Sequence, residues 1–95
     1  MTLFNKNDKQ HHFNQIKGII CEINEGEKFC NITLDVGHEN VRKVNLVTKK
    51  SQFTTVLNGN KIGDKVSARF YITSRKKDDR WYTTANVLVM DKVDD

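Results

Sequence analysis

The sequence contains no proline, only five glycines and only two cysteines among its 95 residues. Without proline, the turns must depend on Gly, Asn and Asp, which tolerate turn conformations. No apolar run approaches the roughly 20 residues of a membrane-spanning helix. The polar start MTLFNKNDKQHH also lacks the apolar stretch of a secretory signal. These absences predict an intracellular, cytoplasmic protein with no membrane partner.

Sequence motifs for catalysis and metal binding are also missing. There is no glycine-rich phosphate loop, no nucleophile elbow and no suitably placed pair of carboxylates. Neither Cys-x-x-Cys nor His-x-x-x-His spacing occurs among Cys21, Cys30, His11, His12 and His38. We therefore expect no enzyme activity, no metal and no cofactor. The two thiols are expected to pack as small hydrophobic groups, although neighbouring strands would also permit a disulfide.

Positive charge is concentrated in the second half of the chain. The net charge is +4, but residues 41–80 hold eleven Lys and Arg against three Asp. Such a concentration is typical of proteins that bind a polyanion. The alternative is a solvated, lysine-rich surface without a specific partner.

Hydrophobic periodicity predicts five strands and one short helix. Gly18, inside the first strand, indicates a bulge or a sharp bend. Ser51 is expected to cap the helix, and Asn58-Gly59 to end it in a left-handed conformation. The predicted strands span residues 16–23, 29–36, 41–48, 65–75 and 81–90, and the predicted helix spans 51–57.

The order of these elements predicts an all-β fold. A short helix between strands three and four (β-β-β-α-β-β) is the connectivity of the five-stranded OB-fold barrel. An open sheet crossed by the helix is the alternative, and Gly18 favours the closed barrel. The predicted organisation is a polar lead-in at 1–12, an OB-fold domain at 13–91 and a short acidic C-terminus at 92–95.

Residues 41–89 (VRKVNLVTKKSQFTTVLNGNKIGDKVSARFYITSRKKDDRWYTTANVLV) resemble the central block of bacterial and phage single-stranded DNA-binding proteins. The matching motifs are RKV, KIGDKV, SRK and RWYT, in that order. The likeness covers about residues 14–90. Two features depart from the family. Val41 and Val47 stand where its third strand usually offers aromatics, and the acidic C-terminus lacks an apolar tip. The chain therefore fits a core domain of the size found in phages or mobile elements better than it fits the longer bacterial proteins of the family.

The resemblance implies a binding face on strands two and three, bordered by the loops that join strands one and two and strands four and five. Alternation points Trp81 inward and Tyr82 outward, although Trp81 could lie beside the groove near the hairpin tip. Phe29 is a further stacking candidate. Plain packing of the aromatics, or a solvated loop with ion pairs at 76–79, is the alternative. The candidate binding residues are Lys43, Asn45, Arg69, Tyr71, Thr73, Arg75, Lys76, Lys77, Arg80, Trp81 and Tyr82.

Together these observations predict largely sequence-independent binding and protection of single-stranded DNA in replication, recombination or repair. Lys and Arg would contact phosphates and the aromatics would stack on bases. We expect a homo-oligomer, either a dimer or a tetramer. The alternatives are binding of single-stranded RNA, or an OB-fold subunit that binds other proteins.

Overall fold

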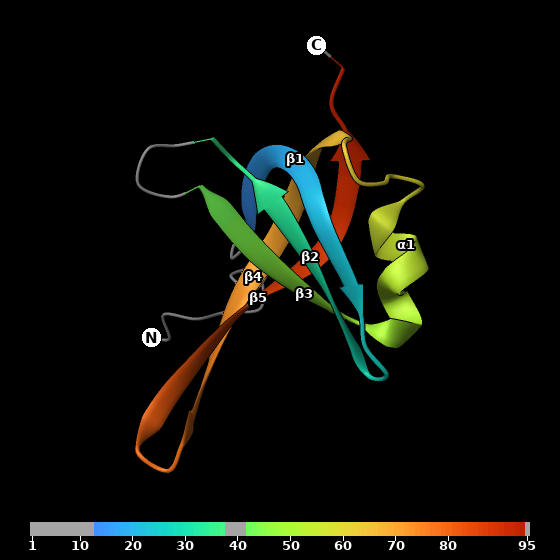
Figure 1. Ribbon diagram of the computed structural model, residues 1–95. Coiled ribbons are helices and arrows are strands. Elements are labelled where there is room, and N and C mark those ends of the chain that lie inside the picture. Colours follow the sequence, from blue (N-terminus) through green and yellow to red (C-terminus); the bar gives the residue numbers. More distant parts are fainter. Residues whose placement is uncertain (1–12, 38–41, 95) are drawn as a thin grey trace, which may run out of the picture.

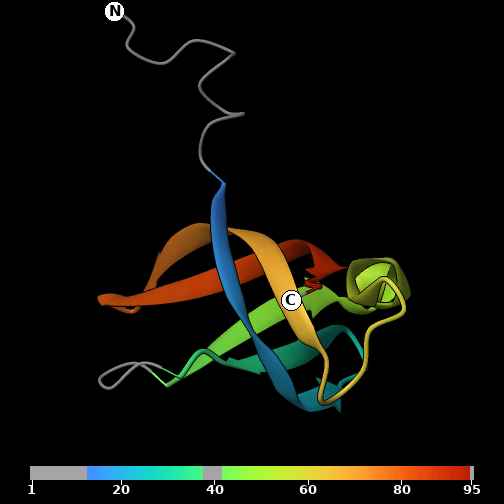
Figure 2. The same ribbon diagram turned by 90° about the horizontal axis from the view of Figure 1, so that it is seen from above.

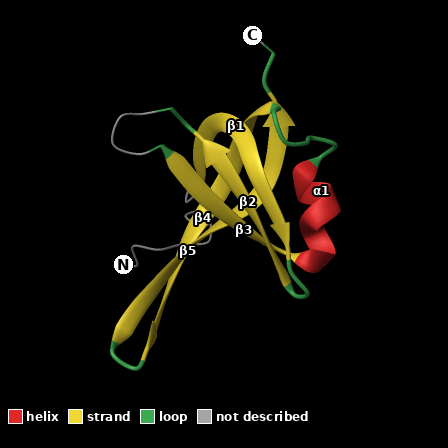
Figure 3. Ribbon diagram, viewed as in Figure 1, coloured by secondary structure: helices red, strands yellow, loops and turns green. Residues whose placement is uncertain are grey.

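The computed structural model describes residues 13–37 and 42–94. The predicted lead-in at 1–12 and Val41 of the predicted third strand lie outside the described residues. Within the described ranges, no helix is long and apolar enough to cross a membrane. The elements, coloured by type in Figure 3, are β1 (Asn14–Glu25), β2 (Phe29–Asp35), β3 (Lys43–Lys49), the 3-10 turn η2 (Lys50–Gln52), α1 (Phe53–Leu57), β4 (Lys65–Lys77) and β5 (Arg80–Lys92).

The strands form a closed barrel in the order β1-β2-β3-β5-β4 (Figures 1 and 2). All neighbouring strands are antiparallel except β3 and β5, which are parallel and meet where Val47 faces Asn86. This order and the position of α1 between β3 and β4 confirm the predicted OB fold. The alternative of an open sheet is wrong.

The barrel closes because β1 bends and serves two neighbours. Residues 14–19 pair with β4, and residues 19–25 pair with β2. A Cβ on Gly18 would lie 2.9 Å from the carbonyl oxygen of Asp35, so glycine permits the close approach at the bend. The predicted bend is confirmed. The irregularity in strand register falls slightly later, between Ile20 and Glu22.

The core is filled by inward side chains of all five strands and closed at one end by α1. Val56 of α1 is 2% exposed, and Phe53 and Leu57 pack against the same cluster. Asn58 (φ 53°) and Gly59 (φ 80°) end the helix in the left-handed region, as predicted. The buried core residues are Ile20, Ile32, Leu34, Leu46, Val56, Val66, Ala68, Val87 and Met90.

The start of the helix differs from the prediction. Ser51 lies inside η2, and Gln52 occupies the position before α1, where no side chain caps the helix. The predicted capping by Ser51 is therefore wrong. The chain enters the helix through a tighter turn, so Ser51 no longer precedes the first free backbone N–H groups.

The two cysteines are free thiols, and Cys30 is fully buried in the barrel. The thiol of Cys21 lies 3.5 Å from the carbonyl oxygen of Thr33. The expectation of packed thiols therefore holds for Cys30, and the alternative of a disulfide does not apply.

Strands β4 and β5 run further than predicted and leave the barrel as a hairpin, which projects from the body in Figure 1. The prediction of a four-residue loop at 76–79 is wrong. Only Asp78 and Asp79 form the turn, and Lys76 and Lys77 belong to β4. Pairing of β4 with β1 ends where Asn14 faces Phe70. We call residues 71–85 the arm.

Leaving the barrel changes which side chains are covered. Ile72, which alternation places on the same side as the buried Val66 and Ala68, is 48% exposed because no described element covers that side of the arm. Further along β5, Phe70 faces Val87 and Arg69 faces Val89, so Leu88 is an extra, unpaired residue. This bulge buries Met90, whereas Val89, which strict alternation from Val87 would point inward, is half-buried.

Candidate nucleic-acid interface

The arm is a regular two-stranded ribbon closed by a two-residue turn. Asp78 (φ 51°) and Asp79 (φ 64°) both take the left-handed conformation, which matches the right-handed twist of the two strands. Next to the turn Lys77 faces Arg80, then Lys76 faces Trp81 and Arg75 faces Tyr82. Because successive side chains of a strand point to opposite sides, this register assigns each residue to one face of the arm.

One face of the arm, which we call the groove face, carries cations, an aromatic ring and hydroxyl groups. Its members are Tyr71, Thr73, Arg75, Lys77, Arg80, Tyr82 and Thr84. The other face continues the side that points into the barrel further along the strands, and we call it the reverse face. Its members are Ile72, Ser74, Lys76, Trp81, Thr83 and Ala85.

The outward face of β2 and β3 is polar and internally hydrogen-bonded. Asn31 faces Val47 across the two strands, and Thr33 faces Asn45. The Asn45 Nδ2 group donates to Asn31 Oδ1 at 2.9 Å, and the Thr33 hydroxyl donates to Asn45 Oδ1 at 3.3 Å. These bonds hold three side chains in one fixed row beside the arm.

Phe29 begins β2 and is positioned by contacts of the β1–β2 loop. The backbone N–H of Lys50 donates to the carbonyl of Lys28, and the Lys50 ammonium lies 2.7 Å from the Glu25 carboxylate. The hydrogen bond to Glu25 raises the pKa of Lys50. Phe29 remains 54% exposed, although the loop that precedes it is anchored by these contacts.

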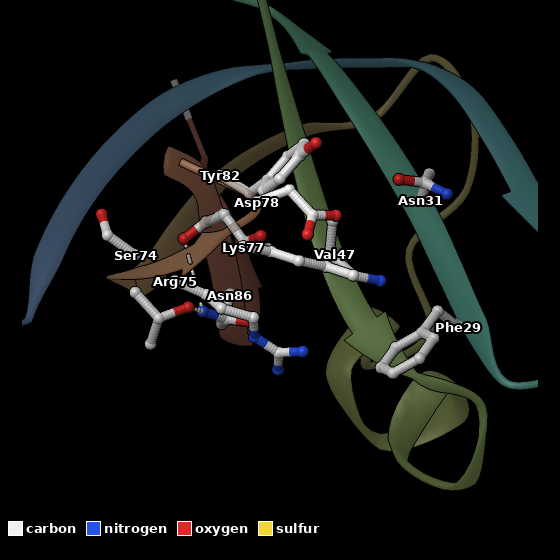
Figure 4. A pocket seen from close by; sticks show the side chains of 11 residues that line it. Phe29, Asn31, Val47, Ser74, Arg75, Lys77, Asp78, Tyr82 and Asn86 are labelled. Atoms are coloured by element: carbon white, nitrogen blue, oxygen red, sulfur yellow. Dashed lines mark hydrogen bonds between the residues drawn. The ribbon is translucent and has the colours of Figure 1, made fainter. Parts of the chain in front are cut away.

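A groove of about 900 Å³ separates the outward face of β2 and β3 from the groove face of the arm (Figure 4). Phe29 and Asn31 form the β2 side, and Val47 of β3 lies between them and the arm. Tyr82, which is 52% exposed, stands on the arm side. The groove is lined by Phe29, Asn31, Val47, Thr73, Ser74, Arg75, Lys77, Asp78, Tyr82, Thr84 and Asn86.

Within the described ranges, no ion pair joins a cation of the groove to an acid. Among the described residues, the ion pairs found join Lys50 to Glu25 and two lysines to Asp64, away from the arm. The alternative prediction of ion pairs within 76–79 is therefore wrong. Asp78 lines the groove without forming an ion pair, so it lowers the local positive charge only in part.

Four of the predicted site residues come together in the groove: Thr73, Arg75, Lys77 and Tyr82. Three further predicted residues lie close by. Tyr71 lines a smaller adjoining pocket that shares Phe29 with the groove, Arg80 faces Lys77 on the groove face, and Asn45 belongs to the row beside Asn31.

The other four predicted residues lie elsewhere. Lys76 and Trp81 are on the reverse face, where Trp81 is 66% exposed. Arg69 is exposed between Gln15 and Val89 on the neighbouring strands, outside the groove. Lys43 stands at the start of β3, opposite Asp35, and does not line the groove.

Several groove residues were not among the predicted site. The sequence offers Phe29 as a stacking candidate, and Val47 stands where the resembling family usually has an aromatic, but the predicted set contains neither of these residues nor Asn31. Asn86 and Thr84 could have been found by alternation, because they share the parity of Tyr82. Ser74 lines the groove although alternation assigns its side chain to the reverse face, and Asp78 lies in the turn. The Asn86 Nδ2 group donates to Thr73 Oγ1 at 2.9 Å, which links the base of the arm across its two strands.

Comparison with known proteins identifies the fold. No family model and no curated protein matches the chain. The dimeric structure of the N-terminal domain of PriB from Thermoanaerobacter tencongensis matches with a TM-score of 0.57 and 16% identity, covering 90% of this chain and 99% of that one.

The mitochondrial single-stranded DNA-binding protein Rim1 of S. cerevisiae matches with a TM-score of 0.53 and 14% identity, covering 85% of this chain and 91% of that one. At these identities the likeness concerns the fold. The chain is thus an OB-fold protein whose barrel is similar to those of PriB and of a mitochondrial single-stranded DNA-binding protein.

Proposed function

We propose that the groove binds single-stranded DNA. The observation that carries this proposal is that one open groove combines half-exposed aromatic rings with cations that form no ion pair among the described residues. Phe29 and Tyr82 offer flat faces to unpaired bases, and Arg75 and Lys77 offer charge to the phosphates. Stacking on one aromatic contributes roughly 1–3 kcal/mol per base, with little dependence on the base.

The polar side chains of the groove support weak sequence preference. Reading a base edge requires donors and acceptors that are free to pair with it. The Asn45 amide already donates to Asn31, and the Asn86 amide already donates to Thr73. Asn31, whose Oδ1 accepts from Asn45, still presents its Nδ2 group to the groove, so base-edge contacts would be few and stacking and phosphate contacts would dominate binding.

The proposed biological role is to bind and protect strands exposed in replication, recombination or repair. The similarity of the barrel to that of Rim1, a protein named for single-stranded DNA binding, supports this class of ligand. We also propose Arg80 and Tyr71 as secondary contacts, because both extend the groove face along the arm. Binding of single-stranded RNA and docking of an acidic protein are the competing functions.

The test is fluorescence anisotropy of labelled oligo(dT), of a matched oligo(U) and of duplex DNA. Titrations at about 50 and 200 mM salt should show a clear loss of oligo(dT) affinity with salt, because phosphate contacts release counterions. We expect the affinity for oligo(dT) to be much higher than the affinity for duplex DNA. Tighter binding of oligo(U) would assign the groove to RNA. No binding of any oligonucleotide at low salt would reject the proposal and favour an acidic protein partner.

A further inference from the structure

Within the described residues the arm has two edges that no further strand covers, because β5 pairs with β3 only at Asn86, and the longer of the two edges belongs to β4. Residues 71–77 of β4 pair with β5 on one side, whereas on the other side the pairing with β1 stops at Phe70. Within the described residues, no strand covers this second edge of the arm. All seven residues are exposed. A free edge of this length presents a row of backbone N–H and C=O groups that can pair with another strand.

We propose that this edge pairs with the same edge of a second copy of the chain. The two β4 strands would run antiparallel about a two-fold axis perpendicular to the sheet at Ser74. Tyr71 would then face Lys77 of the second copy, Ile72 would face Lys76, and Thr73 would face Arg75. The seven free residues pair completely in this register.

Charge selects this register among those with such an axis. The free edge carries three cations, and like charges directly opposite one another destabilise a sheet. With the axis at Ser74, each cation faces a neutral residue. Moving the axis to Arg75 would place Arg75 opposite itself, and moving it to Thr73 would pair only five of the free residues. Charged side chains on a free edge strand commonly oppose its pairing with another chain. A register in which no two cations face each other removes that repulsion.

The reverse face would gain apolar contacts in the same arrangement. Ile72 is 48% exposed and Trp81 is 66% exposed. In the paired sheet, the Lys76 side chain would lie between Trp81 of its own copy and Ile72 of the second copy. Its aliphatic stem could then cover both apolar groups while the ammonium stays in water.

The pairing would also align the two binding grooves. A two-fold axis perpendicular to the sheet keeps both groove faces on the same side of one four-stranded sheet, in the order β5-β4-β4-β5. This consequence rests on the proposed function, whereas the pairing itself does not. A single strand could then pass from one groove to the next across the paired arms.

The test is the oligomeric state of the full chain without nucleic acid, measured by sedimentation equilibrium. Wild type should dimerise. Ser74→Lys should weaken dimerisation at least about tenfold, because two lysines would face each other at the axis. Thr83→Lys is the matched control, since Thr83 lies beside Ser74 on the same face but on β5, away from the edge. An equal mixture of Ser74→Lys and Ser74→Glu should recover the dimer.

Cross-linking tests the register separately from nucleic-acid binding. In a Cys21→Ser background, Ser74→Cys should give a disulfide dimer on mild oxidation with diamide, whereas Thr83→Cys should give far less. A monomeric wild type would overturn the proposal. Hydrogen exchange of the amides at 71–77 would then show whether the chain covers this edge itself, because covered amides exchange slowly. A dimer unaffected by both Ser74 charge variants would also overturn it.

Discussion

At the residue scale, strand parity separates two adjacent aromatic side chains. Tyr82 faces the groove, whereas Trp81 lies on the reverse face of the same strand. Tyr82→Ala should weaken oligo(dT) binding about 5- to 150-fold, which corresponds to the loss of one stacking contact of roughly 1–3 kcal/mol. Anisotropy of labelled oligo(dT) measures the change directly.

Trp81→Ala is the matched control, because it removes a larger aromatic side chain one residue away. Its affinity for oligo(dT) should stay within about twofold of wild type, since Trp81 is outside the groove and surface substitutions have small effects. If Trp81→Ala weakened binding more than Tyr82→Ala, the strand would follow the reverse face of the arm.

Gly18 has a structural role that can be tested by adding one methyl group. The Cβ of Gly18→Ala would lie 2.9 Å from the Asp35 carbonyl oxygen and 3.2 Å from the Leu34 Cβ. We expect the free energy of unfolding to fall by about 1–3 kcal/mol, as for other overpacked sites. Urea denaturation monitored by circular dichroism gives the value.

The comparison variant is Gly59→Ala. Gly59 has φ 80°, and a Cβ added there would have no neighbouring atom within 4 Å. Only the backbone conformation is therefore strained by alanine, at about 1 kcal/mol. Gly59→Asn should recover part of that loss because asparagine tolerates the left-handed region. At Gly18 asparagine should be no better than alanine. Equal behaviour at both positions would contradict the close approach of β1 to β2.

At the element scale, the turn of the arm combines unfavourable residues with a favourable shape. Asp78 and Asp79 both have positive φ, and Asn-Gly is the preferred pair for such a turn. The double variant Asp78→Asn and Asp79→Gly should stabilise the arm and remove two negative charges beside the groove. We expect tighter oligo(dT) binding, measured by anisotropy at several salt concentrations, with a salt slope close to that of wild type because no phosphate contact is added.

A second variant separates shape from charge. Asp78→Asn alone removes the charge that lines the groove and keeps a side chain that tolerates positive φ. It should account for much of the affinity gain. If only the double variant tightens binding, the conformation of the turn contributes more to the affinity than the charge of Asp78 does.

The turn at residues 61–64 links the end of α1 to the barrel and depends on one carboxylate. Asp64 accepts the backbone N–H of Lys61 at 2.9 Å, and its carbonyl accepts the N–H of Ile20 at 3.0 Å. The bond from Lys61, with help from the Lys61 and Lys92 ammonium groups, lowers the pKa of Asp64. The ionised carboxylate therefore holds the shape of the turn, and the backbone carbonyl of the same residue joins the turn to β1.

The lowered pKa of Asp64 predicts a pH dependence of stability. A carboxyl whose pKa is lower in the folded state adds stability above its unfolded pKa, and this stability is lost as pH falls through the folded pKa. Wild type should exceed Asp64→Asn in unfolding free energy at pH 7, and the difference should shrink below about pH 4. Urea denaturation at a series of pH values tests this. A difference independent of pH would assign the effect of Asp64 to geometry alone.

The strands of the barrel could be predicted well because each has one buried face, which makes apolar and polar residues alternate in the sequence. Cys30, Ile32 and Leu34 alternate with polar residues, and all three are fully buried. The arm could not be predicted to its full length for the same reason. Both of its faces are exposed, so its residues carry no period, and Lys76 and Lys77 were assigned to a loop. The bulge at Leu88 is likewise invisible, because the residues around it are all apolar.

At the scale of the whole molecule, the candidate site depends on which strands become neighbours. The sequence places Arg75, Lys77 and Tyr82 on one hairpin, and four of the predicted residues do meet in the groove. Phe29 and Asn31 reach it only because β3 and β5 meet at Val47 and Asn86, far apart in the sequence. Such a contact leaves no local signal. Trp81 lies outside the groove for a reason that is visible in the sequence, because alternation points it and Tyr82 to opposite faces of the same strand.

Charge placement over the whole molecule leads to a prediction about salt. The net charge is +4, and a polyanion could be attracted by this total alone or held at specific cations. These two modes differ in the slope of log affinity against log salt. Each phosphate contact to a single strand contributes about −0.7 to that slope. The slope therefore counts contacts, whereas a general attraction responds equally to any lost charge.

Arg75→Gln and Lys76→Gln remove the same charge from adjacent positions on opposite faces of the arm. Arg75→Gln should make the slope for oligo(dT) shallower by about 0.7, because one phosphate contact is lost. Lys76→Gln should leave the slope nearly unchanged, since its side chain points away from the groove. Titrations at four or more salt concentrations give both slopes. Equal changes in the two variants would mean that the strand responds to overall charge, and the groove would then lose its claim to be the binding site.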